Sequence, residues 1–319
     1  SIALPSSAAS GDPLNLSWTV DNLGANPAVG GWRDTVYLSA DNVWGLDDRR
    51  IGSFDFKGTL APGDSYTGRF TGIMPAAVPA GYRVIVRTDI FDDIQESDEQ
   101  HNTTVSADTL DVTVPELRLG VPLSTSLSSG EDKLFRIVVP QGQTLQVDLK
   151  SASAAAANTM FLRYGALPSG ANYDAAYQGA LQADQRALIP STTAGTYYLL
   201  IHGQSAPAPN TGVTLTARAL PFGITDITPD QGGDSRYVTT TISGAQFDPN
   251  AIVKLVRPGI AEFEPLVWKV VDSSKIIATF DFTDAPHGLY DLKVINPDGS
   301  TATLPYRFLI ERAVEPEVT

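Results

Sequence analysis

The 319-residue sequence contains no cysteine. This absence excludes disulfide bonds, thiol nucleophiles and thiolate metal sites. Secreted eukaryotic β-domains often carry a disulfide bridge, so a cysteine-free chain favours a bacterial source. Stability must then come from packed cores, and a hydrophobic content of 42% is enough to build them.

Long apolar runs and positive charge are also scarce. No run approaches the roughly 18 apolar residues that a membrane span requires, so we expect no direct membrane insertion. There are 36 acidic and 22 basic residues, which gives a net charge of -14. Such a surface repels nucleic acid and anionic lipid, and neither is an expected partner.

Histidine is rare as well. The three histidines are His101, His202 and His287, one in each third of the chain. A catalytic dyad or a zinc site would need ligands from separate regions to meet. The sequence also lacks the metalloprotease, nucleophile-elbow and phosphate-loop motifs. We therefore predict that the chain is not an enzyme.

What the chain does contain is a short stretch that occurs three times. Gly81, Gly195 and Gly288 are each followed within two residues by a tyrosine and then by branched aliphatic residues. Glycine supplies the positive φ of a tight turn, and tyrosine and branched residues suit a half-buried strand. The spacing predicts one such strand near the end of each of three small β-domains.

Alternating apolar and polar residues support this interpretation. In residues 14–20 and again in residues 145–149 every second residue is apolar, the period of a strand with one buried face. Pro115 and Pro221 interrupt the strands that precede them. The sequence predicts an all-β chain of three consecutive β-sandwich domains. They span residues 1–114, 115–220 and 221–319, and the last ends in a polar tail.

The first unit resembles a known family. Residues 10–24 read SGDPLNLSWTVDNLG, residues 32–41 read WRDTVYLSAD, and residues 60–63 read LAPG. These segments, together with residues 88–102, resemble the bacterial cell-adhesion-related domain called CARDB. The resemblance implies an immunoglobulin-like sandwich in exported bacterial proteins.

The second and third units have resemblances of their own. The order of strands in residues 117–219 resembles the bacterial pre-peptidase C-terminal domain, a jelly-roll sandwich often appended to secreted proteases. Asn158 stands where that family often has an acidic residue, which counts against a family-type calcium site. The third unit contains Ile-x-Pro-x-x-Gly-Gly from Ile227, Gly-Ala-x-Phe from Gly244 and Val-x-Asn-Pro-Asp-Gly from Val294. These motifs resemble the IPT/TIG immunoglobulin-like fold.

One acidic loop is a candidate calcium site. Asp41, Asn42, Asp47 and Asp48 surround Trp44 and Gly45. Calcium takes several oxygen ligands from flexible loops, and crowded carboxylates repel one another unless a cation offsets them. The spacing is not that of an EF-hand. The alternative is a solvated hairpin tip in which aspartates stabilise the turn.

A second acidic run contains Asp89, Asp92, Asp93, Glu96, Asp98 and Glu99. We interpret it as an acidic loop before the last strand of the first unit. Exposed aromatic residues would offer a stacking platform for sugars, and the candidates are Trp32, Trp44, Tyr173, Tyr177 and Trp268. Rings in a sandwich are usually buried, and Trp18 belongs to the core because it alternates with Leu16.

The predicted function follows from the architecture. We expect a non-catalytic segment of a large bacterial cell-surface or secreted protein, which extends or presents other domains in adhesion. The alternatives are a module that binds a surface glycan or matrix protein, and an accessory segment of a secreted protease. We interpret the chain as part of a longer protein, whose neighbouring domains are its first partners. No cofactor other than calcium is expected.

The junctions predict the shape. Val114-Pro115-Glu116 and Leu220-Pro221-Phe222 each have proline at the centre. Proline fixes its own φ and holds the preceding residue extended. Such short connections leave little reach for folding one domain back on another. We therefore expect a semi-rigid rod in which the first and third domains make no direct contact.

Overall fold

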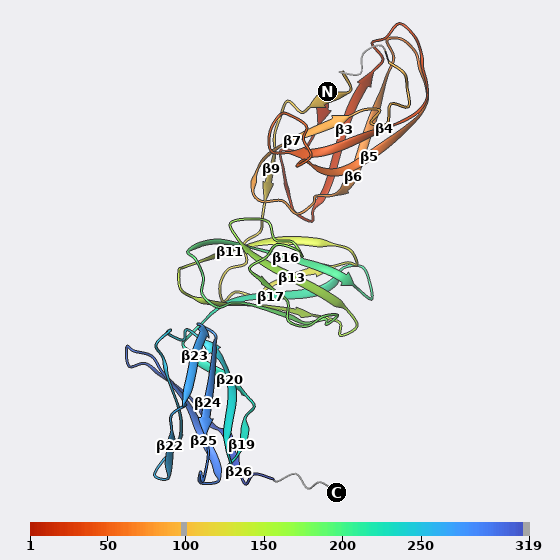
Figure 1. The fold of residues 1–319 in the computed structure, drawn as a ribbon. Coiled ribbons are helices and arrows are strands. Elements are labelled where there is room, and N and C mark those ends of the chain that lie inside the picture. Colours follow the sequence, from red (N-terminus) through yellow and green to blue (C-terminus); the bar gives the residue numbers. More distant parts are fainter. Residues whose placement is uncertain (97–100, 315–319) are drawn as a thin grey trace.

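A computed structural model describes residues 1–96 and 101–314. Apart from a 3₁₀ position at His101, the regular elements in these ranges are β-strands, and the strands form three groups of sheets in chain order. Figure 1 shows the groups arranged in a line, with the second group between the first and the third. The predicted all-β fold class with three consecutive sandwiches is confirmed.

The first group packs two sheets with the orders β1-β3-β6 and β2-β9-β7-β4-β5, and β8 pairs with β7. Its core is built around Leu14, Leu16 and Trp18, the inward positions of the alternating stretch. The strands are β1 (Ile2–Ala3), β2 (Ser7–Ala9), β3 (Pro13–Asp21), β4 (Ala28–Ser39), β5 (Arg49–Leu60), β6 (Ser65–Ile73), β7 (Ala80–Arg87), β8 (Thr103–Val105) and β9 (Leu110–Thr113).

The second group has two four-stranded sheets with the orders β10-β17-β12-β15 and β11-β16-β13-β14, and all their strand pairs are antiparallel. Leu145, Val147 and Leu149 lie in its core, as their alternation predicts. The strands are β10 (Leu123–Leu127), β11 (Asp132–Val139), β12 (Thr144–Ser151), β13 (Ala157–Tyr164), β14 (Ala175–Ala176), β15 (Gln185–Ile189), β16 (Gly195–Ser205) and β17 (Thr211–Leu220).

The third group has the sheets β18-β20-β24-β23 and β19-β26-β25-β21-β22. Five buried aromatic side chains dominate its core, namely Phe247, Phe280, Phe282, Tyr290 and Phe308. The strands are β18 (Gly223–Thr228), β19 (Gln231–Gly233), β20 (Tyr237–Ala245), β21 (Ile252–Arg257), β22 (Ala261–Phe263), β23 (Val267–Asp272), β24 (Lys275–Asp281), β25 (Gly288–Ile295) and β26 (Thr301–Glu311).

No sheet mixes strands from two groups. Only short segments lie between the groups, since β9 ends at Thr113 and β17 ends at Leu220. The predicted boundaries at residues 114/115 and 220/221 fall in these segments and stay predictions. The polar tail, residues 315–319, lies outside the described residues. Within the described part, no helix is long and apolar enough to cross a membrane.

The first and third groups share an opening that the second lacks. In each, the first segment of chain begins in one sheet and then changes to the other, as β1 does before β2 and β18 before β19. The second segment then pairs in parallel with the last strand of its group, β2 with β9 and β19 with β26. This shared topology separates the two immunoglobulin-like sandwiches from the middle one.

The three glycine-tyrosine stretches become β7, β16 and β25. The Tyr82 hydroxyl donates to the carbonyl of Val78 and the Tyr290 hydroxyl to that of Pro286, whereas the Tyr197 hydroxyl accepts from the backbone N–H four residues upstream. This is the tyrosine corner of β-sandwiches. Gly195 and Gly288 have the predicted positive φ, but Gly81 does not.

Candidate functional site

The predicted calcium ligands lie in the loop between β4 and β5. The Asp41 carboxylate accepts from the backbone N–H of Val43 at 2.7 Å. The Asp48 carboxylate accepts from the N–H of Gly45 at 2.8 Å, and Asp47 lies close over Gly45. At least two of the carboxylates are therefore turned onto the backbone of their own loop, as in a hairpin tip stabilised by aspartates.

Asn42 is exposed at the same tip. Within residues 1–96 and 101–314, no group of three or more His, Asp or Glu side chains is arranged to hold a metal ion. The calcium site therefore stays a prediction, and it would require the loop carboxylates to exchange their backbone partners for the ion.

Trp44, in the same loop, covers the outer face of β4 and β7. The Arg87 guanidinium lies 3.9 Å from the centre of the indole ring, and Tyr37 meets the ring edge-on at 6.0 Å. A cation stacked on an aromatic face is attractive. The Trp44 Nε1 atom is buried without a hydrogen-bond partner. The ring therefore anchors the loop and is not free to act as a sugar platform.

The second acidic run is also partly turned inward. Asp89 is only 3% exposed, and its two carboxylate oxygens accept from the N–H groups of Asp93 at 2.9 Å and Ile94 at 2.8 Å. Asp92, like Asp89, has a positive φ. Asp98 and Glu99 lie outside the described residues. The described part of the run is thus a turn built around one buried carboxylate.

The other candidate aromatics do not assemble into a platform. Trp32 is buried beneath Phe56, with ring centres 4.3 Å apart. Tyr173 and Tyr177 pack around Phe161 on the middle group of sheets. Trp268 belongs to the third group, is 45% exposed, and donates through Nε1 to the carbonyl of Ala251. The candidates therefore occupy separate places in all three groups, and the burial of Trp32 removes it as a stacking surface.

A buried carboxylate that the motifs did not reveal lies between the two sheets of the first group. Asp34 on β4 is fully buried. It accepts from the Trp18 indole N–H at 2.6 Å and from the Tyr66 hydroxyl at 2.8 Å. Trp32 Nε1 in turn donates to the Tyr66 hydroxyl at 2.9 Å. The result is a polar network enclosed by aromatic rings.

Burial dominates the electrostatics of this network. Desolvation raises the pKa of Asp34, although hydrogen bonds from Trp18 and Tyr66 oppose the shift. Burial and the nearby Asp34 charge also raise the pKa of Tyr66. The sequence does indicate that Asp34 is buried, because residues 32, 34, 36 and 38 are the inward positions of one strand. A carboxylate at such a position requires donors in the core.

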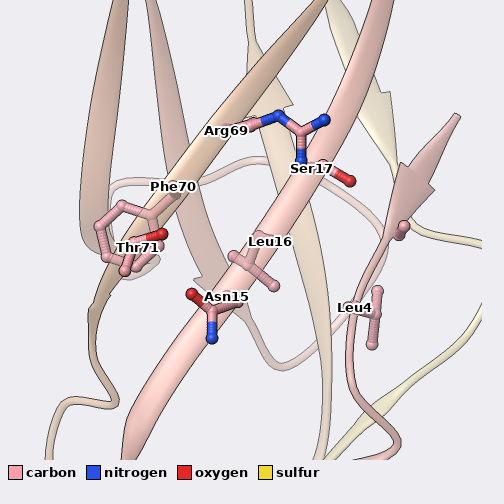
Figure 2. A pocket seen from close by; sticks show the side chains of 8 residues that line it. Leu4, Asn15, Leu16, Ser17, Arg69, Phe70 and Thr71 are labelled. Atoms are coloured by element: carbon pink, nitrogen blue, oxygen red, sulfur yellow. The ribbon is translucent and has the colours of Figure 1, made fainter.

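A surface groove of about 400 Å³ lies beside β3 in the first group. Figure 2 shows Asn15, Leu16 and Ser17 on β3, Arg69 extending across that strand, and Leu4 on a separate segment beyond it. Ala3 pairs with Ser17, so the same register would place Pro5 opposite Asn15. Proline has no N–H to donate, and the chain leaves β3 at this point. The groove is the space that this change of sheet leaves.

The first junction is apolar. Ala76 and Val114 from the first group pack against Leu134 on β11, and all three are buried. Leu167, Tyr198 and Leu200 cover the same contact. Beyond the junction proline, the Pro115 carbonyl accepts from the backbone N–H of Arg136 at 2.9 Å. The connecting chain is thus paired with β11, an edge strand of the middle sandwich.

The second junction is polar. The backbone N–H of Gln246 donates to Thr144 Oγ1 at 3.1 Å, and the Gln246 side-chain amide donates to the carbonyl of Leu220 at 2.7 Å. Ser273 donates through its hydroxyl to the carbonyl of Pro190. Gln246 has a φ of 54°, in the left-handed region that non-glycine residues rarely adopt. Hydrogen bonds therefore hold this joint.

The histidines stay apart, as expected. His202 lies 2.7 Å from Asp132 in the second group, and His287 lies 2.6 Å from Asp234 in the third. Hydrogen bonds from the N–H of Ala313 and from His287 lower the pKa of Asp234. Asp132 and His202 are opposite one another on neighbouring strands. These pairs are cross-strand and loop contacts in separate sandwiches.

Comparison with known proteins supports the first resemblance. Residues 1–106 match the model of the CARDB family, a family of non-catalytic domains. The match covers about a third of the chain. No match to a curated protein was found for the sequence. The IPT/TIG resemblance stays a prediction.

Solved structures with similar folds include single domains and longer chains. A CARDB domain from Pyrococcus furiosus, in complex with di-metal ions, is 16% identical, with 35% of this chain and 84% of that chain covered and a TM-score of 0.27. The pre-peptidase C-terminal domain of Bacillus anthracis collagenase is 16% identical, with 33% and 95% covered and a TM-score of 0.28. TM-scores this low carry no functional conclusion.

A longer similar structure is the SGBP-B protein of a mixed-linkage glucan utilization locus in Bacteroides ovatus, in complex with a mixed-linkage heptasaccharide. It is 12% identical, with 96% of this chain and 65% of that chain covered and a TM-score of 0.27. Here too the score is too low to transfer any property to this chain.

Proposed function

We propose that this chain is a non-catalytic extender of a bacterial cell-surface or secreted protein, which holds neighbouring domains apart and presents them in adhesion. The observation that carries the proposal is the pair of short, proline-centred junctions, each with side-chain contacts across it. A joint with both features resists bending, since proline restricts the backbone and the contacts hold the two faces together.

Two further features support the proposal. The three groups lie in a line, so each added sandwich increases the reach of the chain (Figure 1). The candidate catalytic residue types are dispersed, because the histidine–aspartate pairs belong to different sandwiches. The match of residues 1–106 to a non-catalytic domain family agrees with a structural role.

Small-angle X-ray scattering of the 319-residue chain tests the proposal. A compact globule of this length has a radius of gyration of about 20 Å. We expect a clearly larger value and a distance distribution with a long tail. A matched variant with a flexible Gly-Ser insertion after Pro115 and after Pro221 should broaden that distribution. A radius of gyration near that of a compact globule, or a distance distribution that the insertions leave unchanged, would contradict the extender proposal.

A further inference from the structure

A polar groove lies on the middle group of sheets, beside β12 and β15. Its volume is about 240 Å³, and it is lined by charged side chains, glutamines and one glycine. Leu145, Val147 and Leu149 point into the core, so the alternate residues of β12 point outward to the groove. No aromatic or aliphatic side chain lines it.

The floor of the groove is held by hydrogen bonds from a buried amide. Gln185 is only 4% exposed, and the two N–H groups of its side-chain amide are shared among the carbonyls of Asn158 at 2.7 Å, Gly179 at 2.6 Å and Gln182 at 3.0 Å. These bonds fix the loop before β15 against β13. A buried and fully bonded amide holds the groups around it in one arrangement, so little order would be lost when a ligand binds.

Two ion pairs line the wall of the groove. Arg186 Nε donates to one oxygen of Asp148 at 2.7 Å, and Gln146 donates to the other at 2.7 Å. Lys150 Nζ lies 2.7 Å from Asp184. The two positive and two negative charges cancel. The wall therefore presents alternating donors and acceptors without a net charge.

This arrangement selects a class of ligand. An anion or a cation would gain little from a wall whose charges cancel. A hydroxyl group both donates and accepts, so adjacent hydroxyls on one ring can bond to a carboxylate and a guanidinium or amide at the same time. We propose that this groove binds the neighbouring hydroxyl groups of a neutral saccharide. The activity goes beyond the extender role, because it gives the middle sandwich a ligand.

The groove lacks a ring for stacking, so binding rests on hydrogen bonds that replace bonds to water. We expect a dissociation constant in the millimolar range for one site. Repeated sites on a cell surface would raise the effective affinity through multivalency. A sugar-binding extender would then adhere weakly at each contact and firmly over many.

Gly179 offers a specific test variant. A Cβ atom at this position would overlap the Gln182 side-chain amide. Gly179 does not have a positive φ, so Gly179→Ala introduces no backbone strain there. The substitution displaces one amide from the groove and leaves all four charged side chains in place. Asp148→Asn is the stronger variant, because it removes the negative charge and replaces one of the two acceptor oxygens with an NH2 donor.

Isothermal titration calorimetry on the full 319-residue chain provides the test, with cellohexaose, xylohexaose and mannohexaose as neutral probes. A heparin hexasaccharide and a chitosan hexamer serve as charged probes. We expect at least one neutral probe to bind, about tenfold more weakly to Asp148→Asn and about threefold more weakly to Gly179→Ala. Asp55→Asn, which breaks an ion pair in the first group, should bind like the unchanged chain.

The inference is overturned if no neutral probe binds, if only a charged probe binds, or if both groove variants bind as the unchanged chain does. Melting curves identify a variant that fails to fold, and Gly179→Ala keeps the test valid if Asp148→Asn is unstable. Scattering from the same samples separates this result from the extender proposal, since the groove variants leave both junctions unaltered.

Discussion

The two junctions have the same plan in sequence and opposite chemistry in space. Both centre on a proline between two β-domains. The first is closed by apolar side chains around Leu134, and the second by hydrogen bonds from Gln246 and Ser273. Apolar contact is non-directional, whereas a hydrogen bond weakens steeply away from its preferred angle. The apolar contact therefore holds the first and second domains together. The hydrogen bonds of the second junction hold the second and third domains together and also specify the relative orientation of that pair.

The difference has a structural origin. At the first junction, the loop before β7 and the end of β9 meet the outer face of β11 and β16, which carries the apolar residues Leu134 and Leu200. At the second, Thr144 and Pro190 at one end of the middle sandwich meet Gln246 and Ser273 in loops of the third. A sheet face can offer apolar area, but the ends of strands offer backbone carbonyls that need donors.

The largest expected effect comes from Leu134→Asp. It places an unpaired charge in the apolar contact and should cost at least the roughly 2–5 kcal/mol of a buried Leu→Ala change. We expect the first two sandwiches to separate while each stays folded, with a broader scattering distribution and faster proteolysis near residues 114–116. Val138→Asp is the control, because Val138 lies on the same face of β11 but is 50% exposed. Equal behaviour of the two variants would show that the apolar contact does not hold the joint.

A smaller effect is expected from Thr144→Val at the second junction. The Thr144 hydroxyl is buried, accepts from Gln246 N–H and donates to the Pro190 carbonyl. Its loss leaves both partners unpaired and should cost about 1–3 kcal/mol. Spin labels on the second and third sandwiches should report a wider distance distribution, whereas labels across the first junction should not. Thr214→Val, on a more exposed part of β17, is the matched control. An unchanged distribution would contradict the role of these hydrogen bonds in holding the second junction.

The free energy of unfolding should depend on pH in opposite directions at the buried Asp34 of the first sandwich and at the aspartates of the third. Because the folded-state pKa of Asp34 is raised by burial, the folded state holds its proton more tightly than the unfolded state does. The contribution of Asp34 to the free energy of unfolding therefore falls as pH rises from about 4, its unfolded value, through the folded pKa. Asp234 and Asp281 in the third sandwich have lowered pKa values and act in the opposite sense, with stability lost as pH falls.

Chemical unfolding of the unchanged chain and of Asp34→Asn between pH 4 and 7 checks the direction in which stability changes with pH. The stability of the unchanged chain relative to Asp34→Asn should decrease with rising pH. Asp55→Asn is a control for charge removal at an exposed site, where a hydrogen bond from Arg33 lowers the pKa. A relative stability that rises with pH would mean that the hydrogen bonds of Trp18 and Tyr66 outweigh burial.

The smallest effect expected is that of calcium on the first sandwich. If the loop of Asp41, Asn42, Asp47 and Asp48 binds the ion, millimolar calcium should raise the melting temperature of chelator-treated protein by mass action. Asp41→Asn and Asp48→Asn should remove the response, and distances across both junctions should not change. An identical melting curve with and without calcium would show that the prediction of a calcium site is wrong.

Much of the fold could be predicted because β-strands show their faces in the sequence. The alternation in residues 14–20 and 145–149 correctly assigned which side chains enter the cores. The candidate sugar platform failed at Trp32, because that ring lies at an inward position of β4 together with Asp34. A search for known motifs passed over Asp34, although its inward position marked it as a carboxylate that needs donors.

The groove beside β12 and β15 could not be found from the sequence. Asp148 and Arg186 are 38 residues apart in the chain, and only the antiparallel register of the two strands places them opposite one another. Gln185, which holds the floor, is the polar residue among the inward positions of β15, beside Ala187 and Ile189. Its role depends on three carbonyls from two other segments.

The sequence by itself determined the all-β class, the three sandwiches and the proline at each junction, because these follow from local periodicity and from the covalent geometry of proline. The tertiary structure alone decided what closes each junction and which polar residues meet. Those contacts join residues far apart in the chain, such as Gln246 and Thr144, and their energy depends on distance, angle and burial, which exist only once the strands have found their register.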